Sequence, residues 1–285
     1  MEKLQKLIKK CTLKVLHGGS CPILTKIASN YKNDFGIGSY PFRYRDKMTG
    51  GLGIMIADVY DVLEHKPNSC LVKAAYKQLA KEVLNQFNYL VKNEKIEFEP
   101  YEGKGEPYTS SFDMLLDIHN HHMYFFKTKA GFGGEVEIKD NVMLNKTGLK
   151  INGYELVVND VFRIVHDIFG HAMDGYGFGP IGEDMAWFSH LKMFSPLAAA
   201  ALSMETRGQN CWVNFGKHLR DKNNQLLTKR DLNYIPPPKR PFAEQKMNLL
   251  PSYISGIEVF KKEGEISANY IKVWDPVESI LIHQV

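Results

Sequence analysis

Residues 161–216 read VFRIVHDIFGHAMDGYGFGPIGEDMAWFSHLKMFSPLAAAALSMETRGQNCWVNFG, and this is the most informative part of the sequence. Two histidines, His166 and His171, stand five residues apart on a predicted helix, and carboxylates follow on later helical segments. Side chains five apart on an ideal helix are separated by roughly 140°, so both imidazoles reach one ion only if the helix loosens near its end. Gly170 permits that loosening. The spacing therefore predicts two metal ligands at a helix end.

A carboxylate from a second helix completes the predicted ligand set. Glu205 ends the second of two helix-like runs, 182–194 and 197–205, and Glu183, in the first run, is the alternative ligand. Two imidazoles and one carboxylate leave half of an octahedral metal open for oxygen and substrate. The expected metal ligands are His166, His171 and Glu205, in a site between helices.

Three further side chains are expected to act beside the metal. Glu183, Trp187 and His190 are spaced i, i+4 and i+7, so they share one helix face. From that face, Glu183 and His190 are expected to orient the metal ligands through hydrogen bonds. Arg207 is expected to clamp a substrate carboxylate or phosphate, with a salt bridge as the alternative. Glu183, His190 and Arg207 are thus the candidate catalytic residues.

The segment from His166 to His171, HDIFGH, resembles the His-Glu-Leu-Leu-Gly-His signature of the pterin-dependent aromatic amino-acid hydroxylases. In that family both histidines bind ferrous iron, and a glutamate on the next-but-one helix completes the ligand triad. Glu205 lies 34 residues after His171, so the order and approximate spacing agree. The resemblance implies O₂-dependent hydroxylation at a Fe²⁺ centre. It does not extend to a pterin-binding loop or to that family's substrate residues.

Several segments within residues 60–255 are similar to an uncharacterised domain that bacteriophages and other mobile elements carry. They are YTSSFDM at 108–114, GFG at 131–133, NDVFRIVH at 159–166, ETRGQ at 205–209, WVNFG at 212–216 and FAEQKMNLLP at 242–251. The resemblance implies a viral or mobile-element origin and leaves the chemistry open.

The composition is that of an ordinary globular protein, with 44% hydrophobic and 24% charged residues among 285. The four cysteines, at positions 11, 21, 70 and 211, form no C-x-x-C pair, which favours free thiols in a reduced intracellular setting. No apolar run approaches about eighteen residues, so neither a membrane span nor a secretory signal peptide is expected. We therefore expect a cytoplasmic protein. If a phage encodes the chain, it is expected in the host-cell cytoplasm or in the virion.

The formal net charge of +4 is too small to predict a nucleic-acid partner. Two segments are nevertheless basic. Residues 3–16 are predicted to form an amphipathic helix, and residues 217–240, with seven Lys or Arg against two Asp, a solvated loop. The glycines between residues 36 and 53 form no nucleotide-binding motif.

The predicted fold is mainly α with a small β element (α+β), built as a single helical core. Residues 1–60 are expected to form a loop-rich N-terminal arm, 61–225 the helical metal-binding core and 226–285 a C-terminal wrapping segment, all in one domain. Periodicity predicts a long amphipathic helix over 67–91, a short helix over 110–118 and a strand over 122–128. Asn159 or Asp160 is the expected N-cap of the helix that carries His166.

These features predict a mononuclear non-haem Fe²⁺-dependent oxygenase or hydroxylase that acts on an aromatic or other small-molecule substrate. A reductant such as a pterin is compatible with this chemistry, although no sequence feature supports one. Zn²⁺ on the same ligands would instead activate water for hydrolysis, with Glu183 or Asp167 as general base. A third alternative is a virion or mobile-element structural protein, with a structural metal and with virion partners or further copies of itself.

Overall fold

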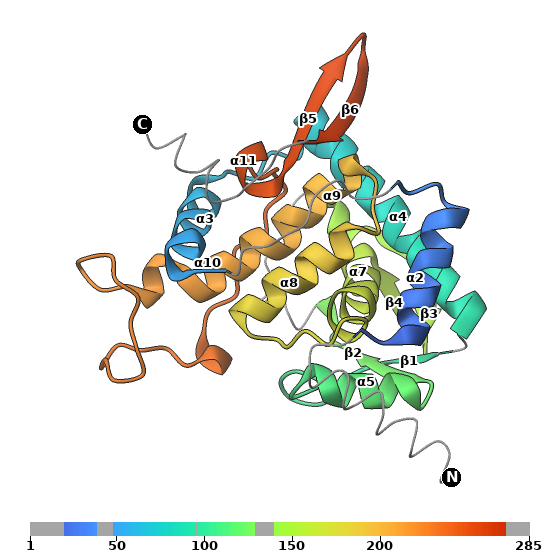
Figure 1. Cartoon of the computed structure of the whole chain (residues 1–285), viewed down its shortest axis with the longest axis horizontal. Coiled ribbons are helices and arrows are strands. Elements are labelled where there is room, and N and C mark those ends of the chain that lie inside the picture. The colour runs from blue at the N-terminus through green and yellow to red at the C-terminus, as the bar shows by residue number, and fades with distance from the viewer. Residues whose placement is uncertain (1–19, 39–47, 95, 129–139, 272–285) are drawn as a thin grey trace.

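The computed structural model describes residues 20–38, 48–94, 96–128 and 140–271 of the chain. Helices dominate these residues, and the strands form only two-stranded sheets (Figure 1). The predicted fold class, mainly α with a small β element, is therefore confirmed. Within the described ranges, no helix has both the length and the apolar character that crossing a membrane requires.

Helix α4 (Cys70–Glu94) is the long helix that periodicity predicted, and it packs against α7 and α9. Five positions of its predicted apolar stripe are buried: Ala75, Leu79, Val83, Phe87 and Leu90. Two polar side chains, Tyr76 and Gln86, are also buried on α4 and contact residues near the candidate site.

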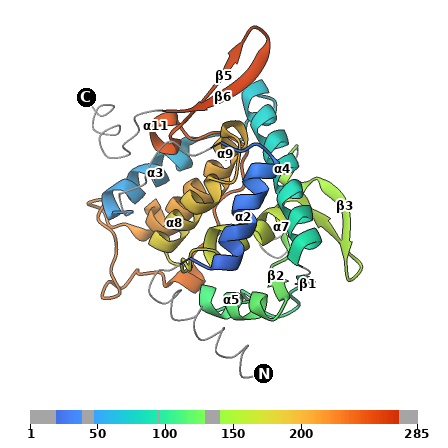
Figure 2. The same ribbon diagram turned by 45° about the vertical axis from the view of Figure 1, so that its right-hand side comes forward.

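Helices α2 (Pro22–Asp34) and α3 (Gly50–Val62) lie in the segment 1–60 that was expected to be rich in loops. Pro22 starts α2, where a missing backbone N–H costs nothing. Gly53 of α3 allows close packing on helix α10, because a Cβ at this position would lie 2.4 Å from the ring of Phe215. Figure 2 shows α2 lying alongside α4. The predicted helix at 3–16 lies outside the described residues.

Helix α7 (Val158–His166) continues directly into a π-helix, η2 (Asp167–Ala172). Its N-cap is Val157, neither Asn159 nor Asp160. Asp160 instead accepts hydrogen bonds from the N–H groups of Val157, at 2.9 Å, and Thr128, at 2.8 Å. The Asp160 carboxylate thus stabilises the start of α7 from inside the first turn.

The remaining core helices are α8 (Pro180–Leu191), α9 (Pro196–Ser203) and α10 (Gln209–Phe215). A second π-helix, η3 (Met204–Gly208), joins α9 to α10, so that residues 196–215 are helical throughout. Helix α8 packs against η2 and α9, and this places its first turn beside the two histidines.

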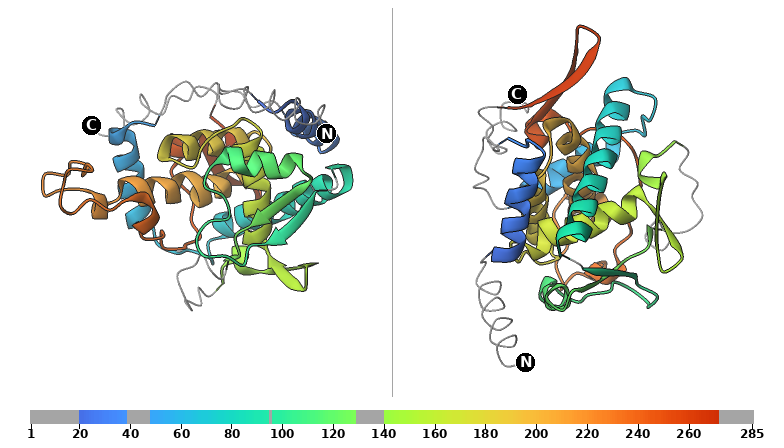
Figure 3. Two further views of the ribbon diagram at one scale, coloured as in Figure 1. Left: turned by 90° about the horizontal axis from the view of Figure 1, so that it is seen from below. Right: turned by 90° about the vertical axis from the view of Figure 1, so that its right-hand side faces the viewer.

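The strands lie around this helical core. β1 (Glu97–Pro100) pairs in parallel with β2 (His122–Phe125) across helix α5 (Ser111–His119), which agrees with the predicted short helix and strand. β3 (Lys146–Ile151) and β4 (Tyr154–Val157) form a hairpin that leads into α7. After the short α11 (Ser252–Ser255), a hairpin of β5 (Ile257–Lys262) and β6 (Glu265–Tyr270) projects from the helical body (Figures 1 and 3).

Candidate metal centre

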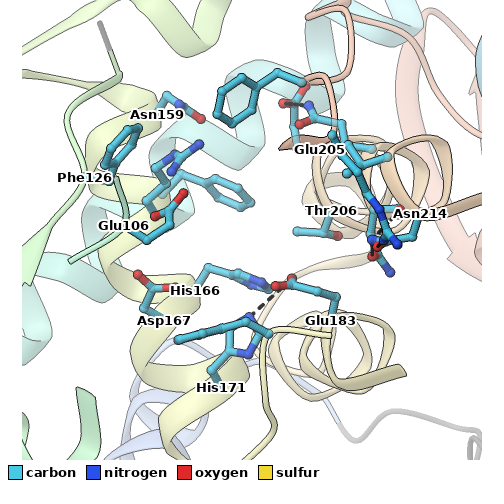
Figure 4. A pocket seen from close by; sticks show the side chains of 18 of the residues that line it. Glu106, Phe126, Asn159, His166, Asp167, His171, Glu183, Glu205, Thr206 and Asn214 are labelled. Atoms are coloured by element: carbon cyan, nitrogen blue, oxygen red, sulfur yellow. Dashed lines mark hydrogen bonds and ion pairs between the residues drawn. The ribbon is translucent and has the colours of Figure 1, made fainter. Parts of the chain in front are cut away.

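Three side chains converge where α7, η2 and α8 meet. His166 ends α7, His171 lies in η2 and Glu183 lies in the first turn of α8. One potential ligand atom from each residue lies within 4.8 Å of the other two. Figure 4 shows these side chains facing one another on the wall of a pocket. Two imidazoles and a carboxylate form a ligand set suited to first-row divalent metals such as Fe²⁺ and Zn²⁺.

The π-helix explains how histidines five residues apart reach one point. At the end of η2 the N–H of Met173 donates to the carbonyl of Ile168, five residues earlier, at 2.8 Å. A π-helical turn contains more residues than an α-helical turn, which brings residues five apart closer to alignment. The imidazole centroids of His166 and His171 lie 5.1 Å apart. The loosening that the sequence required is therefore built into the backbone.

Gly170 allows the two helices to approach each other at this point. A Cβ there would lie 3.0 Å from two ring atoms of His166 and 3.1 Å from the carbonyl oxygen of Ala186 in α8. A larger residue would push α8, which carries Glu183, away from α7. The glycine therefore provides packing space, in addition to the backbone freedom that the sequence analysis assigned to it.

A buried chain of hydrogen bonds fixes the tautomer of His166. The side-chain amide of Gln86 donates to the carbonyl of Met193 at 3.2 Å, so its oxygen accepts from Nε2–H of His190 at 2.8 Å. Burial, and then the charge of His171, lower the pKa of His190 to about 3, so this ring is neutral and its Nδ1 is an acceptor. Nδ1–H of His166 donates to that atom at 3.1 Å, which leaves Nε2 of His166 with a free lone pair for a metal. His190 thus has the orienting contact that was expected of it.

His171 is oriented in the same way by the backbone. Its Nδ1 lies 3.1 Å from the carbonyl oxygen of Tyr176, which can only accept, so Nδ1 carries a hydrogen. Its Nε2 faces the Glu183 carboxylate at 3.3 Å. Burial lowers the pKa of His171, but Glu183 more than compensates, so that this pKa lies above its usual range. Burial keeps the pKa of His166 well below its usual range. Both imidazoles therefore direct Nε2 into the site.

Glu205, the expected third ligand, is not part of this group of three. Its carboxylate accepts hydrogen bonds from the hydroxyl of Tyr76 at 2.5 Å and from the amide of Gln209 at 2.8 Å. Burial raises the pKa of Glu205 to about 7, although both hydrogen bonds lower it. Glu205 lines the same pocket but on another part of its wall (Figure 4). The structure therefore brings the alternative ligand, Glu183, to the histidines.

Arg207 is placed differently from the expected substrate clamp. Its side chain is fully buried, its Nε donates to Asp184 at 2.9 Å and its Nη1 donates to the carbonyl of Ile254 at 2.6 Å. The guanidinium also lies over the ring of Trp187, 4.2 Å from the centroid. Because η3 turns Arg207 into the core, it forms a salt bridge, which was the alternative prediction, and its partner is Asp184.

The three converging residues lie on the wall of a cavity of about 400 Å³. Most of the other lining side chains are polar, and the aromatic ones are Phe126, Phe162, Phe178 and Phe242, with Tyr108. Of the residues expected beside the metal, His190 and Arg207 do not line this cavity. Asn159 and Arg163 also line the cavity, and neither was among the predicted site residues. Their positions seven and three residues before His166, on one helix face, are the signal that could have identified them.

Comparison with known proteins gives no match to a family model, to a curated protein or to a solved structure.

Proposed function

We propose that this chain is an enzyme that binds one Fe²⁺ ion through His166, His171 and Glu183 and uses O₂ to oxidise a small molecule. The observation that carries the proposal is the convergence of these three ligand atoms within 4.8 Å on the wall of a cavity of about 400 Å³. Two histidines and one carboxylate on one side of a metal, with open positions opposite, are typical of non-haem Fe²⁺ oxygenases. A cavity of this size accommodates a small organic substrate.

The surrounding residues support a reactive site more than a structural one. His190 and the Tyr176 carbonyl hold the two imidazoles in the tautomer that presents Nε2, as partners of metal-bound histidines generally do. A structural metal site is typically closed by four protein ligands, whereas the described residues supply a group of three. Bound Fe²⁺ would supply the one-electron and O₂ chemistry, which protein side chains alone do not perform. The phenylalanines on the cavity wall would reduce access of water to the reacting groups.

Hydrolysis with Zn²⁺ on the same ligands is the second candidate, because one further carboxylate favours it. Asp167 follows His166 directly and lines the cavity. A carboxylate at that place has the position of a general base for a metal-bound water. The hydrolase proposal predicts turnover without oxygen, and this distinguishes it from the oxygenase.

Metal analysis of protein purified without oxygen tests the proposal. We expect about one Fe²⁺ per chain and a visible nitrosyl spectrum after addition of nitric oxide, because open coordination positions admit the gas. Glu183→Ala should abolish Fe²⁺ binding, and Glu205→Ala should retain it. Stoichiometric Zn²⁺ together with oxygen-independent turnover would exclude the oxygenase. Retained Fe²⁺ binding in Glu183→Ala would exclude the proposed ligand set.

A further inference from the structure

One half-buried cation on the cavity wall is not used by the proposed metal site. Arg163 lies in the last turn of α7, three residues before His166, and its side chain lines the cavity. Asn159, Arg163 and His166 are spaced i, i+4 and i+7, so the helix face that presents a metal ligand also presents this guanidinium. A group bound by Arg163 would therefore lie next to the metal.

The Arg163 guanidinium lies over the ring of Phe126, with its carbon 5.4 Å from the ring centroid. The carboxylates of Glu106 and Asp167 line the same cavity. Burial raises the pKa of Asp167 to about 7, against the charges of His171 and Arg163, which lower it. In the described part of the chain, neither carboxylate forms an ion pair with Arg163 within 4.0 Å. A partly buried guanidinium carries up to five N–H donors and is costly to leave without an acceptor.

The other arginines near the site already have partners. Arg207 is paired with Asp184 inside the core. Arg240, on the far part of the cavity wall, donates to the carbonyl of Ile235 at 3.2 Å and to the side-chain oxygen of Asn214. Arg163 is therefore the pocket guanidinium whose donors are not committed to protein acceptors in the described residues.

We propose that Arg163 binds an anionic group of the substrate, a carboxylate or a phosphate, and so positions the substrate beside the metal. Planar guanidinium groups bind both anions through paired hydrogen bonds. Two aromatic rings line the cavity here: Phe126 lies against the guanidinium, and Phe162 is stacked on His166 with ring centroids 5.8 Å apart. The favoured ligand is thus an anion carried on an apolar or aromatic body. This inference names the substrate class for the proposed enzyme and rests on that proposal.

Calorimetric titration with three matched probes tests this inference. The probes are benzoate, phenyl phosphate and the neutral benzamide, each added to metal-free protein and to protein loaded with Zn²⁺, which has no redox chemistry. We expect at least one anion to bind more tightly than benzamide, and the tighter anion assigns the chemical class. Arg163→Gln should weaken that binding by about tenfold or more, and Arg163→Lys should weaken it less. Arg230→Gln, an exposed position outside the cavity, should bind as the wild type does.

Two results would overturn the inference: equal binding of the anions to wild type and to Arg163→Gln, or binding of benzamide as tight as that of both anions. Absence of anion binding to a wild type that does bind Zn²⁺ would overturn it as well. Failure of the proposed metal site is seen separately, as absence of metal binding to the wild type. In that case the titrations of the metal-free protein still report on Arg163, because it is not a metal ligand.

Discussion

Replacing Glu205 by Gln should remove a pH dependence from the folding stability of this protein. Burial raises the pKa of Glu205 to about 7 in the folded state, against hydrogen bonds from Tyr76 and Gln209 that lower it. An unfolded chain releases the same proton near the ordinary glutamate pKa of about 4.3. Between these two pH values the folded state holds a proton that the unfolded state has lost. The free energy of unfolding therefore falls as the pH rises through this window.

The pKa difference sets the size of the effect. A difference of one unit corresponds to about 1.4 kcal/mol, so this carboxyl should make the wild type about 2 to 3 kcal/mol less stable at pH 8 than at pH 5. Glu205→Gln retains a similar shape but cannot titrate, and it should lack this contribution. Urea unfolding of both metal-free proteins at pH 5 and pH 8 measures it, because other groups titrate in both proteins and cancel in the comparison.

Glu265→Gln is a suitable control, since Glu265 is exposed at the start of β6. It should retain the pH dependence of the wild type. If wild type and Glu205→Gln differ in their pH dependence by less than about 1 kcal/mol, Glu205 is already ionised at pH 5 and the reasoning is refuted. That outcome would also return Glu205 to consideration as a metal ligand, because a carboxylate has to be ionised to bind a metal.

Three further predictions follow from the packing around the site. Gly170→Ala should weaken metal binding about tenfold or more, because the added methyl group would meet the His166 ring and the α8 backbone. Gly177→Ala, which has open space around its Cβ, should bind the metal as the wild type does. Equal affinities of the two variants in a metal titration would contradict this prediction. His190→Gln should lower metal affinity about 10- to 100-fold by releasing the orientation of His166, with His218→Gln as the control outside the cavity. Arg207→Met should destabilise the fold by about 3 to 5 kcal/mol, because it removes the cationic partner of the buried Asp184 carboxylate, and it should leave metal affinity unchanged. A stable variant with lost metal binding would show that Arg207 acts in the site.

Features that depend on local spacing could be predicted from the sequence. The buried stripe of α4 follows from helical periodicity, and the residues spaced along it are buried, namely Ala75, Leu79, Val83, Phe87 and Leu90. The pairing of His166 with His171 depends on a loosened turn, which the i,i+5 spacing required and which the π-helix η2 provides. The face shared by Glu183 and His190 follows from their i, i+7 spacing in α8. Each of these features lies within one continuous helical segment, where the number of residues between two side chains fixes the angle between them.

Features that depend on how helices pack could not be predicted. Residues 1–60 were expected to form a loop-rich arm, yet Gly53 lies in helix α3, where it allows contact with Phe215 in a helix 162 residues later in the chain. Glu183 and Glu205 were both plausible as the third ligand, since each lies on a helix after the histidines. Sequence distance does not state which of the two helices presents its carboxylate to α7.

The helical character of the protein and the pairing of two histidines could thus be predicted from residue spacing alone. The packing of α8 brings Glu183 to that pair, while Tyr76 of α4 donates a hydrogen bond to the Glu205 carboxylate. The tertiary structure also turned Arg207 into a buried ion pair and left Arg163 on the cavity wall. The physical reason is that helical periodicity fixes which residues share a face, whereas the direction that each face takes depends on side-chain packing between segments far apart in the chain.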